Sequence, residues 1–221
     1  MHCHHMDNMN KYYKYYLIAL LVVIIDQTSK MLVYYNMDIG TFGEVNVLGD
    51  WFKLHYLLNP GMAFGLRWDW EYGKLALSLF RVLAMFGIGY YLYTLAKKGV
   101  HRGLLISMGL ILGGAIGNVV DSTFYGVFLE NNAINGAITP WFHGQVIDML
   151  FFPIFDGYYP DWIPSLGGDY FLFFSPVFNV ADSSIFIGVL FILIMQKRFF
   201  VADKSEEEVE VEESAQAVVT E

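Results

Sequence analysis

Four aspartates in apolar surroundings are the residues of this sequence that could do chemistry. They are Asp26, Asp121, Asp148 and Asp182, and each lies in or beside a stretch of aliphatic and aromatic residues. A charge near hydrocarbon costs about 2.5–3.5 kcal/mol even on lenient insertion scales, so each needs a reason. Two carboxylates that share one proton can act together, one as a base toward water and the other as an acid. Acid–base hydrolysis is therefore one interpretation of these residues.

Two of the aspartates follow an asparagine by three positions, in Asn118-Val-Val-Asp121 and Asn179-Val-Ala-Asp182. On a helix this spacing puts the amide and the carboxylate on one face, where the amide can hydrogen-bond the acid or a substrate beside it. Two interpretations stay open from the residues alone. The carboxylates converge as catalysts, with the mirrored patterns favouring Asp121 and Asp182 as the pair, or they are helix caps and end groups.

Asp26 and Lys30 lie four positions apart with the acid first, which favours a helical ion pair. Near the outer end of a span we interpret the pair as structural, because it neutralises itself and holds the helix at the interface. Gly113, Gly114 and Gly117, in the third apolar segment, are typical of close helix packing.

Other chemistries have weaker support. A dyad of Ser29 and Lys30 is disfavoured because neighbours on a helix point in different directions. His143 is a lone histidine, interpreted as a surface or packing residue. Cys3 and its neighbouring histidines lie at a terminus without preorganised geometry, so no metal site is expected. The sequence has no zinc-protease motif, no phosphate-binding loop and no basic patch for nucleic acid.

Membrane spans are the elements that must position the aspartates. Hydrophobic residues make up 56% of the 221 residues and charged residues 16%, against about 25% charged in soluble domains. A helix needs about 20 apolar residues to cross a bilayer. Four segments approach that length, residues 15–35, 75–95, 104–121 and 180–198. We therefore predict an α-helical membrane protein with four transmembrane helices.

The two longer loops have different characters. Loop 36–73 carries an alternating pattern through Val45, Val47, Leu54 and Tyr56, which predicts a small extramembrane sheet. Loop 122–178 is rich in Gly, Pro and aromatic residues, a composition suited to the membrane–water interface.

Basic residues predict the orientation of the spans. If all four spans form, eight Lys and Arg residues fall on one side: Lys11, Lys14, Lys97, Lys98, Arg102, Lys197, Arg198 and Lys204. The positive-inside rule then puts both termini in the cytoplasm and both long loops outside. The predicted organisation is a cytoplasmic N-terminus (1–14), one membrane domain (15–200) and an acidic, disordered cytoplasmic tail (201–221) that carries much of the net charge of −9.

Five motifs follow one another along the chain: Asp26-Gln-Thr-Ser-Lys30, Asn59-Pro-Gly-Met-Ala-Phe-Gly65, Gly113-Gly-Ala-Ile-Gly-Asn-Val-Val-Asp121, Val146-Ile-Asp148 and Phe178-Asn-Val-Ala-Asp182. In this order, and from about residue 16 to 194, they resemble the motifs of the lipoprotein signal peptidase (signal peptidase II) family. The resemblance implies four spans, an external sheet that cradles substrate and an external lid segment.

The resemblance also implies a function and a division of roles. It implies an aspartic endopeptidase of the bacterial inner membrane that cleaves lipid-modified precursor proteins before a diacylglyceryl cysteine. The catalytic pair would be Asp148 and Asp182, with Asp121 as a supporting residue. Positions that match the substrate site or its support are Asn59, Gly61, Asn118, Asn179, Ala181, Asp26 and Lys30. No cofactor is implied, the partners are precursor proteins and membrane lipids, and a monomer is expected.

Two departures from the family pattern stand out. The third motif usually ends Asp-Arg, but Ser122 follows Asp121 here, so a role of that arginine must be met otherwise or lost. The separation of Asp148 from Asp182 is longer than usual, and the extra residues within 151–174 predict an enlarged lid. Two rival functions are a small ion-coupled transporter, which would need carboxylates near the bilayer midplane, and a non-enzymatic scaffold.

Overall fold

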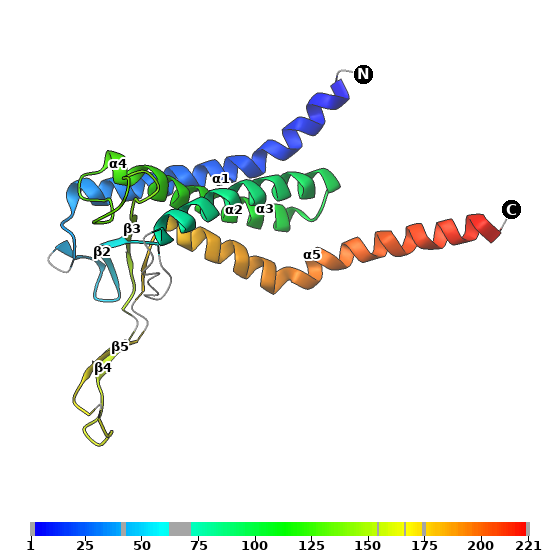
Figure 1. Ribbon diagram of the computed structural model, residues 1–221. Helices are drawn as coiled ribbons and strands as arrows, with labels where there is room; N and C mark the ends of the chain where they lie inside the picture. The colour runs from blue at the N-terminus through cyan, green and yellow to red at the C-terminus, as the bar shows by residue number, and fades with distance from the viewer. Residues whose placement is uncertain are drawn as a thin grey trace.

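Four helices that are long and apolar enough to cross a membrane form the body of the described structure (Figure 1). The computed structural model describes residues 3–40, 43–61, 72–153, 155–165, 167–173 and 176–219. Its candidate spans are Tyr12–Asn36, Gly73–Lys98, Arg102–Phe128 and Val180–Phe199. The predicted helical membrane fold is confirmed, and each candidate span extends beyond its predicted stretch, the third one furthest, to Phe128.

The helices begin and end at residues with clear local causes. Helix α1 is Cys3–Asn36, α2 is Gly73–Lys98, α3 is Arg102–Val120, and α5 is Val180–Val219. Gly99 ends α2 in the left-handed conformation, with a φ of 73° that suits glycine. His101 caps α3 by accepting a hydrogen bond from the Gly103 N–H. Along the chain, α3 is followed by a π-helical turn, Asp121–Tyr125, and by the short α4, Gly126–Phe128.

Helix α3 is the centre of the bundle. It packs against α1, α2 and α5, and 61% of its apolar window is buried, against 11–28% in the other spans. Glycines allow this closeness, since a Cβ on Gly113 would lie 2.7 Å from the Val22 Cβ, and one on Gly114 would overlap the Ala181 carbonyl. The packing interpretation of these glycines is confirmed, and it brings the motif helices together.

A small antiparallel sheet lies at one end of the bundle (Figure 1). Its strand order is β1-β2-β3-β6, with bounds Val45–Leu48, Phe52–Asn59, Val146–Phe151 and Val177–Phe178. The strands predicted from the period-two pattern are confirmed as β1 and β2. β2 pairs with β3, which places Leu57 opposite Asp148. The sheet thereby carries one aspartate to the ends of the helices.

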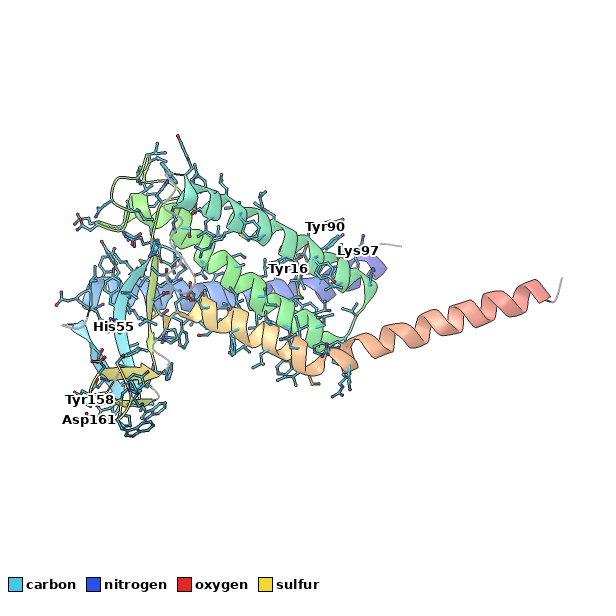
Figure 2. All side chains as sticks on the ribbon, turned by 60° about the horizontal axis from the view of Figure 1, so that its bottom comes forward. Tyr16, His55, Tyr90, Lys97, Tyr158 and Asp161 are labelled. Atoms are coloured by element: carbon cyan, nitrogen blue, oxygen red, sulfur yellow. The ribbon has the colours of Figure 1, made fainter. Side chains whose placement is uncertain are left out.

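The extra residues between β3 and β6 form a second hairpin, β4 (Phe155–Tyr158) with β5 (Tyr170–Phe173). The sequence predicts an enlarged lid there, but this hairpin projects away from the helices (Figure 1). Figure 2 shows Tyr158 and Asp161 on it, and Lys97 at the opposite end of the bundle. The insertion thus extends the sheet side of the molecule.

Helix α5 continues as a helix to Val219, into the acidic segment for which composition predicts disorder. Two physical reasons favour this. The tail is rich in Glu and Ala, which are good helix formers, and extending an existing helix avoids the cost of nucleation. In the same way, α1 begins at Cys3, ahead of the predicted span.

Candidate active site

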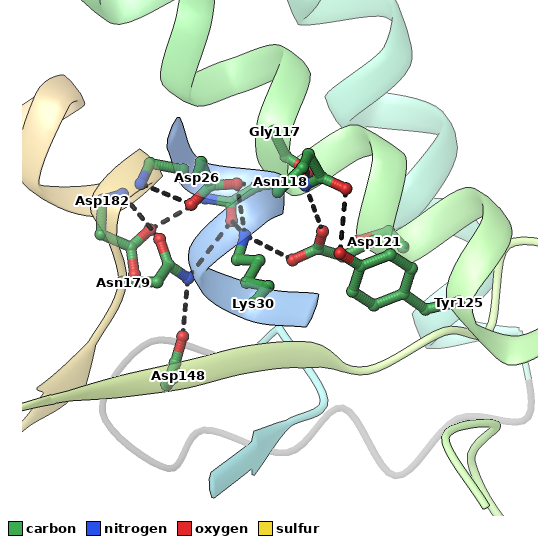
Figure 3. A network of polar contacts seen from close by, with 12 residues as sticks. Asp26, Lys30, Gly117, Asn118, Asp121, Tyr125, Asp148, Asn179 and Asp182 are labelled. Atoms are coloured by element: carbon green, nitrogen blue, oxygen red, sulfur yellow. Dashed lines mark hydrogen bonds and ion pairs between the residues drawn. The ribbon is translucent and has the colours of Figure 1, made fainter. Parts of the chain in front are cut away.

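Asp148 and Asp182 meet where the sheet reaches the helix ends (Figure 3). The side chain of Asn179 contacts both residues. Its Nδ2 donates to Asp148 Oδ1 at 2.7 Å, and its Oδ1 accepts from the backbone N–H of Asp182 at 2.8 Å. The two carboxylates also interact electrostatically. The structure therefore brings together the two aspartates that the resemblance implies as a pair.

Asp148 is a buried carboxyl group with polar partners on two sides. Its side chain is 1% exposed, and Asn59 Nδ2 donates to its Oδ2 at 2.9 Å. Burial, together with the charge of Asp182, raises the pKa of Asp148 to about 7, although hydrogen bonds from Asn59 and Asn179 oppose the shift. A carboxyl group with such a pKa can hold or release a proton near neutral pH.

Asp182 is not the cap of its helix. That role belongs to Asn179, which accepts the Asp182 N–H, and to Asp26, whose Oδ1 accepts the Ala181 N–H at 2.8 Å. The Asp182 carboxylate is thus left to accept a hydrogen bond from Asn118 Nδ2 at 2.8 Å. The amides of the two Asn-x-x-Asp motifs donate to carboxylates of other elements, Asn118 to Asp182 and Asn179 to Asp148, and not to the aspartate of their own motif.

Lys30 lies at the centre of a second, fully buried group. Its Nζ lies 2.8 Å from Asp26 Oδ2 and 2.6 Å from Asp121 Oδ2, and all three side chains are 0% exposed. The predicted ion pair of Asp26 and Lys30 therefore forms, but it does not simply neutralise itself at the interface. It joins α1 to the end of α3, and Gly117 makes room for it, since a Cβ there would lie 2.6 Å from Asp26 Oδ2.

Lys74, Arg81 and Tyr125 lie in or beside this network but outside the motifs, whereas Gln27 lies in the first motif and Ser122 follows the third, both without an assigned role. Gln27 Nε2 donates to Asp121 Oδ1 at 2.9 Å, and Tyr125 donates to Gln27 Oε1 at 2.9 Å. Lys74, Arg81 and Ser122 lie on the α2 side. Arg81 carried a usable signal, because a charged residue inside an apolar span requires a partner.

Tyr125 could not be found in this way. It reaches Gln27 from the π-helical turn that begins at Asp121. Such turns occur often at functional sites. None of the motifs in this sequence marks the turn.

The remaining candidates do not join the site. His143 is buried, and its Nδ1 contacts the Trp141 carbonyl oxygen at 2.9 Å, which confirms a packing role. No group of three potential metal ligands occurs within the described part of the chain. The side chain of Cys3 lies outside the described side chains, and His2 outside the described residues.

Comparison with known proteins adds to this geometry. The sequence profile of the family described as Signal peptidase (SPase) II matches residues 18–198. The chain belongs to the signal peptidase II family. The matched range includes Asp26, Asp121, Asp148 and Asp182. The match to this protease family therefore covers the same carboxylates that the structure brings together.

Individual relatives agree. The chain is 48% identical over 189 residues to the lipoprotein signal peptidase of Amoebophilus asiaticus, covering 85% of this chain and 79% of that protein. It is 41% identical over 191 residues to that of Porphyromonas gingivalis, covering 82% and 81%.

Solved structures described as bacterial membrane enzymes share the fold. One has a TM-score of 0.57 at 25% identity, covering 84% of this chain and 95% of that one. A second has a TM-score of 0.56 at 24% identity, covering 88% and 94%. The chain is thus a multi-pass bacterial membrane protein of a protease family.

Proposed function

We propose that this protein is an aspartic endopeptidase that removes signal peptides from lipid-modified precursor proteins, with Asp148 and Asp182 as the catalytic pair. The observation that carries the proposal is the shared contact with Asn179, whose amide donates to the buried carboxylate of Asp148 and accepts from the backbone N–H of the half-buried Asp182. Membership in the signal peptidase II family supports the reaction and the substrate class.

The chemistry follows from one proton held between two carboxyl groups. The ionised carboxylate takes a proton from water as the water attacks the scissile carbonyl carbon, and the protonated one donates to the departing amine nitrogen. The peptide C–N bond breaks, and the pair returns to one proton. The proton belongs to the pair as a unit, because the two groups titrate together. No step requires a metal.

The positions of the supporting residues fit a membrane substrate. Asn59, Gly61, Asn118 and Asn179 lie around the pair, at the level where the sheet meets the spans. We propose that a precursor with its signal helix in the lipid presents the bond before its lipid-modified cysteine at this level. All these residues come from one chain, which supports a monomer as the active unit.

Isosteric substitution of the pair tests the proposal. Asp148→Asn and Asp182→Asn should each lower cleavage of a purified lipid-modified precursor by about 10²–10⁴-fold, while the protein still inserts and folds. Asp161→Asn, on the projecting hairpin, is the matched control and should cleave normally. Near-normal cleavage by either Asp148→Asn or Asp182→Asn would remove that residue from the pair.

The orientation is also a proposal. The eight basic residues on one side support cytoplasmic termini and an extracytoplasmic site. Cys3 is the only cysteine and lies near the N-terminus, so a membrane-impermeant thiol reagent should label it only after cells are permeabilised. Labelling in intact cells would reverse the assigned orientation.

A further inference from the structure

Two cationic side chains of helix α2 contact the turn that directly follows β2, beside the carboxylate site. Lys74 Nζ donates to the Pro60 carbonyl oxygen at 2.8 Å. Arg81 Nη2 donates to the Gly61 carbonyl oxygen at 3.1 Å, and its Nη1 donates to Ser122 Oγ at 2.9 Å. Lys74 and Ser122 are buried and Arg81 is half-buried. One guanidinium thus links three segments: α2, the turn after β2 and the π-helical turn.

The turn is shaped to receive these cations. Gly61 has a φ of +90°, and a Cβ there would lie 2.7 Å from Arg81 Nη1 and 3.1 Å from Lys74 Nζ. The Gly61 N–H donates to Asn59 Oδ1 at 2.8 Å, and the Asn59 amide donates to Asp148 at 2.9 Å. A continuous chain of hydrogen bonds therefore runs from Arg81 through Gly61 and Asn59 to Asp148.

Arg81 is also a source of positive charge for the aspartate pair. The carboxylates of Asp182, Asp121 and Asp148 lie near enough to interact electrostatically with its guanidinium. Lys30, by contrast, is engaged by Asp26 and Asp121 in two short ion pairs. Among the described residues Arg81 makes no ion pair, and its two hydrogen-bond acceptors, Ser122 Oγ and the Gly61 carbonyl oxygen, are neutral. Its charge therefore acts on the pair from a fixed position without joining it.

We infer that Arg81 is a positioning residue for the hydrolysis proposed above, which holds Asn59 against Asp148 and stabilises the singly ionised pair through its charge. This inference rests on the proposed function. Ser122 fits the same role, because its hydroxyl gives the guanidinium an acceptor where a larger cationic side chain would compete for the space.

Three variants test the inference on the full-length protein, with cleavage of a lipid-modified precursor measured across pH. Arg81→Gln should lower kcat by about 10–100-fold, as misplaced catalytic groups do, with a smaller change in KM. A nearby positive charge favours the ionised form of a carboxyl group, so its loss should move both limbs of the pH profile to higher pH. Arg81→Lys keeps the charge, so its limbs should stay in place and kcat should partly recover.

The third variant breaks the contact from the other side. Gly61→Ala should displace the guanidinium and change kcat and the pH limbs in the same direction as Arg81→Gln. Arg102→Gln, at the opposite end of the bundle, is the matched control and should behave as wild type. If Arg81→Gln fails to fold, the inference is tested with Arg81→Lys and Gly61→Ala alone.

The results that would contradict this inference differ from those that would contradict the proposed function. Unmoved limbs in Arg81→Gln and Gly61→Ala, or wild-type kcat in Arg81→Lys and Gly61→Ala, would overturn the inference. If the variants of Asp148 and Asp182 are inactive while the Arg81 variants behave as wild type, only this inference fails. If Asp148→Asn or Asp182→Asn still cleaves, the proposed function fails first.

Discussion

Asp26 and Asp121 are held by a lysine, whereas Asp148 and Asp182 are held by amides. Both groups are carboxylates at the same end of the bundle, and Figure 3 shows them side by side. In the first group the ammonium of Lys30 lies between the two carboxylates and compensates their charges. In the second group the amides orient the oxygens but leave like charges facing each other, which favours the uptake of one proton.

The difference shows how aspartate can serve two purposes at neighbouring places in one structure. A buried ion pair is costly to break, because removal of one partner leaves an uncompensated charge away from water. A buried pair of acids is costly to keep fully ionised, which is the property that acid–base chemistry uses. We therefore assign the first group to the structure of the bundle and the second to the reaction.

The largest stability effect should come from the centre of the first group. Lys30→Met leaves Asp26 and Asp121 buried without a cation, and should lower the free energy of unfolding by about 3–5 kcal/mol. Thermal or denaturant unfolding in detergent measures it. Asp148→Asn, which removes a charge from a like-charged pair, is the comparison and should unfold close to wild type. Equal losses in the two variants would erase the distinction between the groups.

A matched pair of amide deletions sharpens the comparison through pH. Asn59→Ala removes a hydrogen bond that stabilises ionised Asp148, so the pKa of Asp148 should rise further above its value of about 7. The alkaline limb of cleavage, where the pair loses its proton, should then move up by about one pH unit. Gln27→Ala removes an equally long bond to Asp121 and should leave the limb in place. A shift in Gln27→Ala alone would reverse the assignment.

The smallest effect should come from the outer edge of the first group. Tyr125→Phe deletes the hydrogen bond to Gln27 Oε1 and should lower the free energy of unfolding by about 1 kcal/mol. Cleavage and its pH profile should not change, because the proposed catalytic pair keeps all its partners. A pH shift in this variant would show that the two groups are coupled.

Much of this architecture can be predicted from the sequence because the signals are local. Long apolar runs predict the four spans, and alternation through Val45 and Val47 predicts β1, since both follow from the periodicity of a single segment. Helix spacing predicts the ion pair of Asp26 and Lys30. The resemblance to a family adds the choice of Asp148 over Asp121, which spacing alone does not make.

Only the tertiary structure decides which polar groups meet. The bonds from Asn118 to Asp182, from Asn179 to Asp148 and from Arg81 to Ser122 each join separate elements. No local pattern encodes them, because they depend on how closely α3 approaches its neighbours and on the register of β3 against β2. The sequence by itself determines that four carboxylates lie in or beside apolar stretches, and the packing decides that a lysine neutralises two of them while amides hold the other two.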